Sequence, residues 1–320
     1  MKLIYKERIG DKRIIHIGFV KIKYQKHGYK KLYESVQQEL EKTVNQLEYL
    51  KKHSDITKLK PATGALRDFQ LKLLKYCNIQ IVDFEKHGWK PFLCAGSLLG
   101  CVRHGGYIPW DDDFDVGMMR EDFDKCEEYI KNKYVNIDNS KLDYRDNFVE
   151  NFYKLLDEYF KKYPNQTLFF KFWEHIQLFC GTSLDDYVWL DIFPYDYYKD
   201  DYKFEEHQKY YSNFRKNIYK LGSLQKIIDC VKTERLNNPN IVKKSNTIYY
   251  GIDNSESSFR HNRFIPVEKF LPLQKIKFEN YEFYVPNDYK YVCETSFPDW
   301  KQYPKDFGCS HHLEELKDNK

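Results

Sequence analysis

The sequence predicts an α+β fold in which a mixed β-sheet is flanked by helices. Two observations lead to this prediction. Apolar residues recur at spacings of three and four in several segments, which indicates amphipathic helices. Short apolar runs, at residues 91–95 and 188–194, lie between those segments and are typical of buried strands. A chain of 320 residues can bury a sizeable core, as one large domain or as a main domain with additions.

The first ninety residues predict an extension followed by the start of the main domain. Residues 1–24 predict a β-hairpin, because a turn at 10–12 is followed by alternating apolar residues. From 32 to 50, the apolar spacing predicts an amphipathic helix that packs on a core or in a coiled coil. A second helix is expected to start after residues 63–64 and to end at Gly88.

The central part of the chain is expected to alternate between strands and helices. A buried strand at 91–95 leads into a tight turn and a short helix at 96–100, and an acidic strand follows. Helices are predicted at 120–134 and 146–163. A buried strand interrupted by one carboxylate is predicted at 188–194, where a lone Asp is costly unless it is paired or binds metal.

The last third predicts helices at about 202–221 and 224–236. A second hairpin is expected over residues 276–285, with its turn at 279–280. A short helix is expected after Pro286. No internal repeat or convincing linker interrupts this order.

Composition limits the partners that we expect. The 52 Lys and Arg residues against 48 Asp and Glu give a formal net charge of only +4, with no dense basic block, so nucleic-acid binding is not expected. The eight cysteines form no Cys-x-x-Cys pair, which argues against a zinc ribbon and favours free thiols in a reducing compartment. No signal-peptide core and no run of ~20 apolar residues occurs, so we expect a cytoplasmic protein without a transmembrane segment.

Residues 111–115 place four carboxylates in five positions. Their mutual repulsion is costly in a folded chain unless they are solvated or bind a cation. If Phe114 and Val116 face a core, Asp113 and Asp115 share the opposite face of a strand, roughly 7 Å apart. Two carboxylates placed in this way can bind one divalent ion or bridge two.

Three interpretations of this acidic cluster compete. An EF-hand calcium loop is disfavoured because Val116 stands where that loop needs Gly, and because Pro109 prevents a preceding helix. A solvated acidic turn is disfavoured by the apolar residues that flank the cluster. The third interpretation is a catalytic metal site of the nucleotidyltransferase type, with a Gly-Ser turn, a helix, an Asp-x-Asp strand and a third carboxylate on a neighbouring strand.

The third interpretation assigns a role to each carboxylate. Asp113, Asp115 and Asp191 are predicted to be catalytic and to bind Mg²⁺ or Mn²⁺, because a divalent ion neutralises and orients a pyrophosphate donor. Asp191 is also expected to draw the proton from an attacking hydroxyl. Asp111 and Asp112 are expected to hold the loop and tune the site from behind the metal ligands.

The donor phosphate needs further partners besides the metal. The backbone N–H groups of Gly96 and Ser97, at the start of a helix, can bind its oxygens. Arg103 can add a cation. His104 is a fourth candidate for phosphate binding, with a structural place in the turn after the helix as the alternative.

At this point the sequence resembles a known family. Residues 96–118 resemble the signature of the LicD family, which also includes the fukutin-like proteins. The resemblance touches residues from about 66 to 300, and its further segments are 66–74, 120–123, 191–196 and 278–289. The length and order of the central motif make it a strong signal.

The resemblance implies a nucleotidyltransferase-like fold and metal-dependent transfer of a phospho-alcohol from a CDP-linked donor to a sugar hydroxyl, with release of CMP. Phosphocholine transfer from CDP-choline to a bacterial surface glycan, such as lipopolysaccharide, capsule or teichoic acid, is the favoured outcome. Tyr195 and residues 296–300 depart from the family pattern and put substrate choice in doubt. The alternatives are a nucleotidyltransferase that moves a nucleoside monophosphate from an NTP, and a non-catalytic homologue that binds glycan or nucleotide.

The implied partners suggest further site residues. A choline group needs an aromatic face, and four aromatic residues near the catalytic positions are candidates for choline or acceptor contacts, with packing as the alternative. They are Tyr107, Trp110, Trp189 and Tyr195. A lipid-linked acceptor would bring the protein to the inner face of the membrane as a peripheral protein.

The predicted domains are an N-terminal hairpin and helix at 1–55, a LicD-type catalytic domain at 56–310 and a polar tail at 311–320. Residues 1–50 and the last twenty residues lie outside the resemblance.

Overall fold

The structure is a computed structural model, and it divides the chain into two compact units, residues 1–56 and 57–320. The predicted polar tail lies outside the described residues. The described residues are 4–9, 12–17, 20–24, 29–252 and 263–303.

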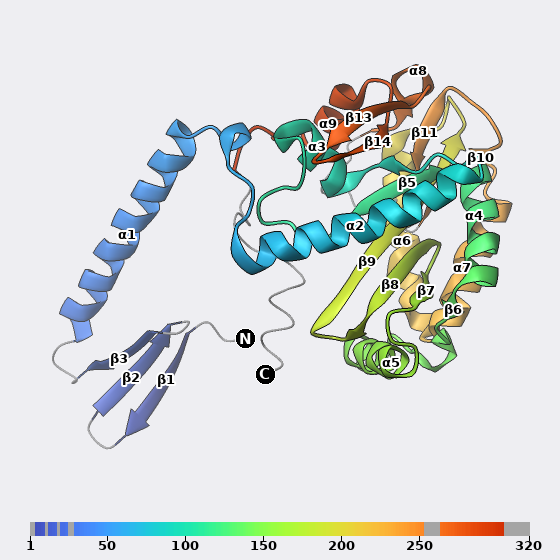
Figure 1. The fold of residues 1–320 in the computed structure, drawn as a ribbon. Coiled ribbons are helices and arrows are strands. Elements are labelled where there is room, and N and C mark those ends of the chain that lie inside the picture. Colours follow the sequence, from blue (N-terminus) through green and yellow to red (C-terminus); the bar gives the residue numbers. More distant parts are fainter. Residues whose placement is uncertain (1–3, 10–11, 18–19, 25–28, 253–262, 304–320) are drawn as a thin grey trace. The chain divides into compact units, whose positions relative to one another are not determined.

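The first unit contains a three-stranded antiparallel sheet and a long helix (Figure 1). Strands β1 (Ile4–Ile9), β2 (Lys12–Ile17) and β3 (Val20–Tyr24) pair in chain order. The predicted single hairpin is therefore wrong, because its second strand is divided into β2 and β3. Ile15 of β2 and Ile22 of β3 are register partners in an antiparallel pair, and the alternation of apolar residues within each strand looks the same whether or not the chain reverses between them.

Helix α1 (Tyr29–His53) confirms the predicted helix and extends it at both ends. The part of its apolar stripe from Leu40 to Leu50 is exposed and does not pack on a core within the described part of the chain. Leu40 is 61% exposed, Leu47 44% and Leu50 60%. Packing in a coiled coil stays a prediction.

Eleven strands of the second unit, counted over the described residues, form one mixed sheet. The strands are β4 (Phe92–Leu93), β5 (Asp115–Met119), β6 (Val135–Asn136), β7 (Thr167–Phe172), β8 (His175–Ser183), β9 (Asp186–Tyr198), β10 (Ile241–Val242), β11 (Thr247–Tyr250), β12 (Ile265–Pro266), β13 (Gln274–Phe278) and β14 (Tyr281–Val285). The main order is β13-β14-β4-β5-β9-β8-β7-β6, while β10 and β11 pair with β9, and β12 pairs with β11. Parallel pairs (β5–β9, β4–β14 and β6–β7) occur beside antiparallel ones, so the predicted mixed sheet is confirmed.

Helices flank this sheet as predicted, and α2 runs across it in Figure 1. The helices are α2 (Gly64–Lys86), α3 (Ala95–His104), α4 (Arg120–Lys133), α5 (Phe148–Lys162), α6 (Phe204–Ile218), α7 (Leu224–Asn237), α8 (Val267–Phe270) and α9 (Tyr289–Ser296). Among the described helices, none combines the length and apolarity that crossing a bilayer would require.

Strands β5 and β9 give the sheet two chemically different faces. Val116 and Ile192 are register partners, are buried, and share a core cluster with Cys77 of α2. Phe114 is also fully buried, so the predicted core-facing residues are confirmed. Side chains alternate along a strand, and Asp115 therefore lies on the opposite face from Val116.

Strands β7 and β8 are absent from the sequence-based predictions, although they lie beside the site. Apolar and β-branched residues in Thr167–Phe172 were a usable signal. The alternation in His175–Ser183 is weaker, because polar residues stand at several positions. β8 pairs antiparallel with β9 and so lies next to the carboxylate-bearing strand.

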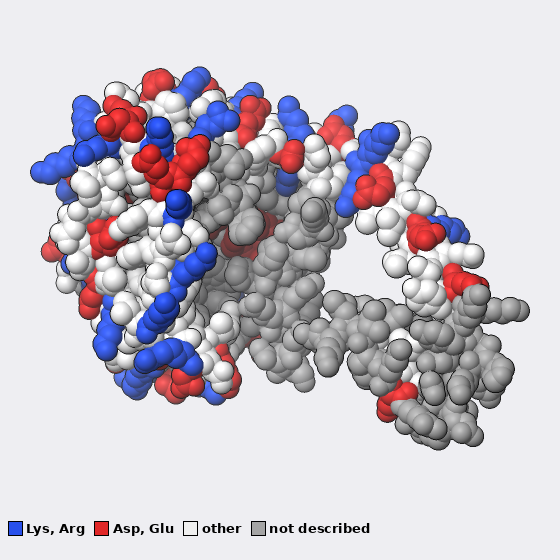
Figure 2. All heavy atoms as spheres, turned by 180° about the vertical axis from the view of Figure 1, so that it is seen from behind, with Lys and Arg blue, Asp and Glu red and all other residues white. Residues whose placement is uncertain are grey.

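Both kinds of charge are spread over the described surface of the second unit on the side that Figure 2 shows. Lys and Arg side chains alternate there with Asp and Glu side chains, so neither sign dominates this face. This matches the small net charge of +4.

His207 of α6 is fully buried and is surrounded by aromatic rings. Its two ring nitrogens make no hydrogen bond in the described part of the chain. Burial lowers the pKa of His207 to about 3, so the ring is neutral in the folded protein near neutral pH. The rings around it, with centroids 4.8–6.1 Å away, belong to Tyr198, Tyr202, Phe204, Tyr211, Tyr249 and Phe264.

We expect His207→Phe to make the protein less sensitive to mild acid. Below pH ~6.5 the unfolded chain takes up a proton at His207 that the folded chain does not. The free energy of unfolding therefore decreases as the pH is lowered. Between pH 7 and pH 5 this loss amounts to about 2 kcal/mol in the wild type and is absent in the variant. Urea unfolding at the two pH values measures it. An equal loss in both proteins would refute the assignment, and the exposed His53→Gln serves as the control.

Candidate active site

Asp115 and Asp191 lie side by side in the sheet. They are register partners in the parallel pair β5–β9, so their side chains project from the same face. Asp115 is 7% exposed and Asp191 is 8% exposed. Two nearly buried carboxylates on neighbouring strands repel each other, which favours a bound cation between them.

Asp113 lies in the irregular segment before β5 and not on the strand, so the predicted strand face shared by Asp113 and Asp115 is corrected. The strand begins only where β9 provides a hydrogen-bonding partner. A side chain on Gly96 would lie 3.1 Å from Asp111 Oδ2 and 3.9 Å from Asp113 Oδ1. Gly96 therefore leaves room for both carboxylates beside the start of α3.

Ser97 ties α3 to the first residue of β5. The Asp115 backbone N–H donates to Ser97 Oγ at 2.8 Å, and Ser97 is 3% exposed. The hydroxyl thereby fixes the position of Asp115. The backbone N–H groups at the start of α3 are the part of this turn that remains suited to a phosphate oxygen.

Gln70 of α2 holds the acidic loop and was not found from the sequence. Its Nε2 donates to the Asp111 carbonyl at 2.8 Å and to the Ile108 carbonyl at 3.2 Å. Gln70 is fully buried. A glutamine in line with the mainly apolar residues on the buried side of α2 was the available signal, because a buried amide needs partners. Asp112 is 1% exposed in the same loop.

Arg103 and His104 contact each other and the C-terminal part of the described chain. Arg103 Nε donates to His104 Nε2 at 2.8 Å, one Arg103 terminal nitrogen donates to the Trp300 carbonyl at 2.9 Å, and the guanidinium lies over the Trp110 ring at 5.7 Å. Burial, reinforced by Arg103, lowers the pKa of His104 to about 4. These contacts hold the loop around Trp110 in place.

Three of the four predicted aromatic contacts lie in the core. Tyr107 is 4% exposed, Trp189 5% and Tyr195 3%. Tyr195 packs edge-on against Phe92 with centroids 4.9 Å apart. Trp110 is the partly exposed member of the set.

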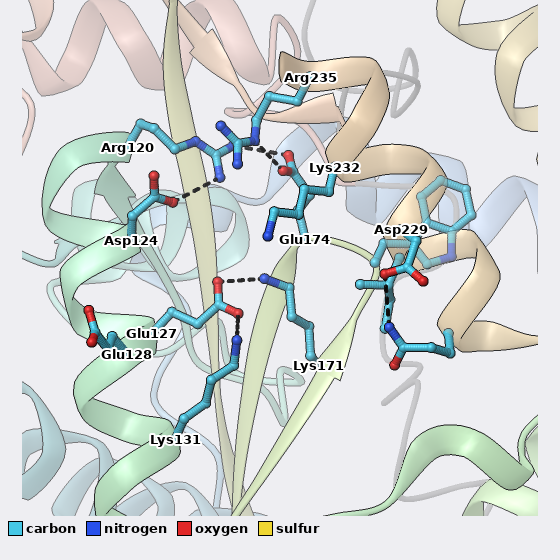
Figure 3. Close-up of a pocket in the computed structure, with 13 residues that line it drawn as sticks. Arg120, Asp124, Glu127, Glu128, Lys131, Lys171, Glu174, Asp229, Lys232 and Arg235 are labelled. Atoms are coloured by element: carbon cyan, nitrogen blue, oxygen red, sulfur yellow. Dashed lines mark hydrogen bonds and ion pairs between the residues drawn. The ribbon is translucent and has the colours of Figure 1, made fainter. Parts of the chain in front are cut away.

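A charged cavity of about 390 Å³ opens at the other end of β5, between α4, β7 and α7 (Figure 3). Lys171 and Lys232 reach into it. Its cationic lining residues are Arg120, Lys131, Lys171, Lys232 and Arg235, and its acidic ones are Asp124, Glu127, Glu128, Glu174 and Asp229.

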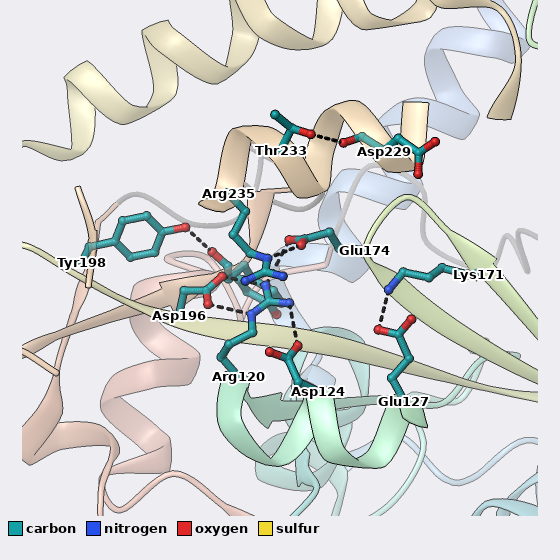
Figure 4. A network of polar contacts seen from close by, with 11 residues as sticks. Arg120, Asp124, Glu127, Lys171, Glu174, Asp196, Tyr198, Asp229, Thr233 and Arg235 are labelled. Atoms are coloured by element: carbon teal, nitrogen blue, oxygen red, sulfur yellow. Dashed lines mark hydrogen bonds and ion pairs between the residues drawn. The ribbon is translucent and has the colours of Figure 1, made fainter. Parts of the chain in front are cut away.

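A buried ion-pair network closes one side of this cavity (Figure 4). Arg120 donates to both oxygens of Asp196, at 2.8 and 2.7 Å, and to Glu174 Oε2 at 3.0 Å. Arg235 Nε binds the other Glu174 oxygen at 2.5 Å. Asp196, the last residue of the Asp-Ile-Phe-Pro-Tyr-Asp element, therefore anchors α4 to β9.

The oxygen donors at Asp115 and Asp191 fit a hard divalent ion such as Mg²⁺, which prefers carboxylates. Asp113, the third predicted ligand, precedes Asp115 by two residues in the chain. Within the described ranges, no three Asp, Glu, His or Cys side chains are grouped closely enough to hold an ion as they stand. The carboxylate pair is thus the part of the predicted ligand set that the fold brings together.

The chain matches the model of a protein family described as LicD/FKTN/FKRP, nucleotidyltransferase domain, over residues 88–210. This range begins before β4 and ends within α6, and it contains the acidic loop, β5 and β9.

Individual relatives match over shorter stretches. The lipopolysaccharide cholinephosphotransferase LicD of Haemophilus influenzae is 38% identical over 60 residues, 19% of this chain and 23% of the relative. The human ribitol 5-phosphate transferase FKRP is 50% identical over 44 residues, 14% of this chain and 9% of the relative. An uncharacterized protein of Rickettsia prowazekii, RP689, is 54% identical over 37 residues, 12% of this chain and 14% of the relative. The matches thus cover less than a quarter of each relative's length.

Proposed function

Because this chain belongs to the LicD family, we propose that it is a metal-dependent transferase that moves a phospho-alcohol from a CDP-linked donor to a hydroxyl of a glycan. The observation that carries the proposal is the in-register pair Asp115–Asp191 on one sheet face, within the segment that matches the family. Both transferases among the relatives carry phosphorylated alcohols in their names, which supports a phosphotransferase.

The proposed fold of residues 57–303 is nucleotidyltransferase-like. Its support is the order of the parts: a short strand, a helix with Gly96 and Ser97, a strand that starts at Asp115, and a neighbouring strand with Asp191.

The proposed reaction is one substitution at phosphorus. The acceptor hydroxyl oxygen forms a bond to the β-phosphorus of the donor, the bond from that phosphorus to the CMP oxygen breaks, and CMP leaves. Asp191 accepts the hydroxyl proton. A divalent ion held by Asp115, Asp191 and Asp113 would neutralise the negative charge of the diphosphate. The first backbone N–H groups of α3 bind oxygens of the donor.

We propose CDP-choline as the donor and a bacterial surface glycan precursor as the acceptor. The choice of CDP-choline as the donor rests on the name of the Haemophilus relative, a cholinephosphotransferase. Trp110 is the partly exposed aromatic residue beside the acidic loop that would meet the quaternary ammonium group. A lipid-linked acceptor would be met in the cytoplasm, at the inner face of the membrane.

A donor screen tests the proposed function. The protein is incubated with Mg²⁺ and with CDP-choline, CDP-ethanolamine, CDP-glycerol or CDP-ribitol, and CMP release and thermal shift are measured. We expect CMP from at least one donor and none in the presence of EDTA. Pyrophosphate released from an NTP, with no CMP from any CDP-alcohol, would contradict the proposal and indicate a nucleotidyltransferase.

A further inference from the structure

We infer that Gln177 of β8 is a substrate-binding residue of the proposed site, and that its side-chain amide donates a hydrogen bond to the phosphoryl group being transferred. The inference rests on the proposed function and adds a residue that no motif contains.

The position of Gln177 follows from the strand register. Gln177 lies opposite Asp191 in the antiparallel pair β8–β9, and Asp191 lies beside Asp115 in the pair β5–β9. Register partners project to the same face, with Cβ atoms about 4.5–5.5 Å apart in an antiparallel pair. The three side chains thus form one row across three neighbouring strands.

The length of the side chain sets where its amide lies. Glutamine has one methylene more than aspartate, and side chains stand roughly perpendicular to a sheet. The amide therefore reaches above the level of the Asp191 carboxylate. A phosphoryl group bound over the carboxylates occupies that level.

The surroundings of Gln177 also favour a ligand contact. The next residue of the row is Phe170 on β7, which is 1% exposed, so Gln177 is the last polar side chain of the row on that side. His175 lies two residues before Gln177 on β8, and Phe193 lies two residues after Asp191 on β9. The centroids of their rings are 4.9 Å apart. The Gln177 side chain is half-buried, and no hydrogen bond within the described residues uses its amide. A half-buried amide in such a setting gains from a polar partner.

The proposed chemistry needs a donor at this place. Negative charge on the non-bridging oxygens of a phosphoryl group must be met by positive groups or by N–H donors. Of the two donors expected from the sequence, Arg103 donates to His104 Nε2 and to the Trp300 carbonyl, and His104 accepts from Arg103. The Gln177 amide adds a neutral N–H donor without competing for the metal ligands.

The test compares two nucleotides as probes. CDP carries a β-phosphate that corresponds to the transferred group, whereas CMP lacks it. Dissociation constants for CDP and CMP are measured by calorimetry with Mg²⁺ present, for the wild type, Gln177→Leu, Gln177→Glu and the exposed control Gln166→Leu. Binding of Mn²⁺ alone, followed by electron paramagnetic resonance, reports on the metal ligands.

We expect Gln177→Leu to weaken CDP binding roughly ten-fold, the usual effect of losing one hydrogen bond to a charged group. Gln177→Glu should weaken it further, because its carboxylate repels the phosphate. CMP and Mn²⁺ binding should stay within about two-fold for the leucine variant, and the control should match the wild type.

Other results have distinct meanings. Unchanged CDP binding by Gln177→Leu, or an equal loss of CDP and CMP binding, overturns the assignment of Gln177 while the proposed function stands. A loss of Mn²⁺ binding by Gln177→Leu overturns it in favour of a metal ligand. A wild type that binds neither nucleotide overturns the proposed function and the assignment with it.

Discussion

Replacing Asp115 by Asn is expected to lower CMP release by roughly 10³-fold or more, because the variant loses one of two adjacent carboxylates that would hold the divalent ion. The fold should persist. Asn has nearly the same volume, and the change removes repulsion between Asp115 and Asp191, so the thermal midpoint should stay the same or rise. CMP release under saturating donor and a thermal melt measure the two effects.

The matched control is Asp201→Asn, which makes the same chemical change at an exposed carboxylate. Its CMP release should stay within about two-fold of the wild type. Asp191→Asn should behave like Asp115→Asn, because the two side chains share one face. Turnover retained by either site variant would refute the assignment of a shared metal site.

Replacing Arg120 by Ala is expected to lower the free energy of unfolding by about 3–5 kcal/mol, the usual cost of removing one partner from a buried ion pair. The Asp196 side chain is 2% exposed and that of Glu174 is 4% exposed, so both lose a cation that water cannot replace. Burial by itself lowers the pKa of Arg120, but the carboxylates of Asp196 and Glu174 outweigh burial and hold this pKa well above its ordinary value. Urea unfolding measures the loss.

Arg145→Ala is the matched control. Arg145 pairs with Asp143 at 2.6 Å, but its side chain is 65% exposed, so the expected loss of stability is much smaller than for Arg120→Ala. Arg120→Lys keeps a charge without the two-pronged geometry and should fall between wild type and Arg120→Ala. A loss for Arg120→Ala no larger than for the control would contradict a stabilising role for the network.

Local signals in the sequence were sufficient for most of the helices. The segments predicted at 63–88, 120–134, 146–163 and 224–236 correspond to α2, α4, α5 and α7. The spacing of apolar residues and the glycine near an end are properties of a single segment, so no knowledge of its neighbours is needed.

The strands and their pairing were harder to predict from the sequence. β5 begins at Asp115 and not before Asp113, because a strand exists only where a neighbour supplies hydrogen bonds. β7 and β8 were missed, since a half-polar strand resembles a loop when its partner is unknown. The first predicted hairpin was in fact three strands.

The candidate site shows the same division. The sequence alone determined the resemblance to the LicD family, the acidic loop and the choice of Asp113, Asp115 and Asp191 as candidate metal ligands, because a motif is carried by consecutive residues. Only the tertiary structure decided that Asp191 stands beside Asp115 and opposite Gln177, and that Arg103 bonds to the Trp300 carbonyl. Register and burial depend on how segments far apart in the chain pack, and no local pattern specifies that.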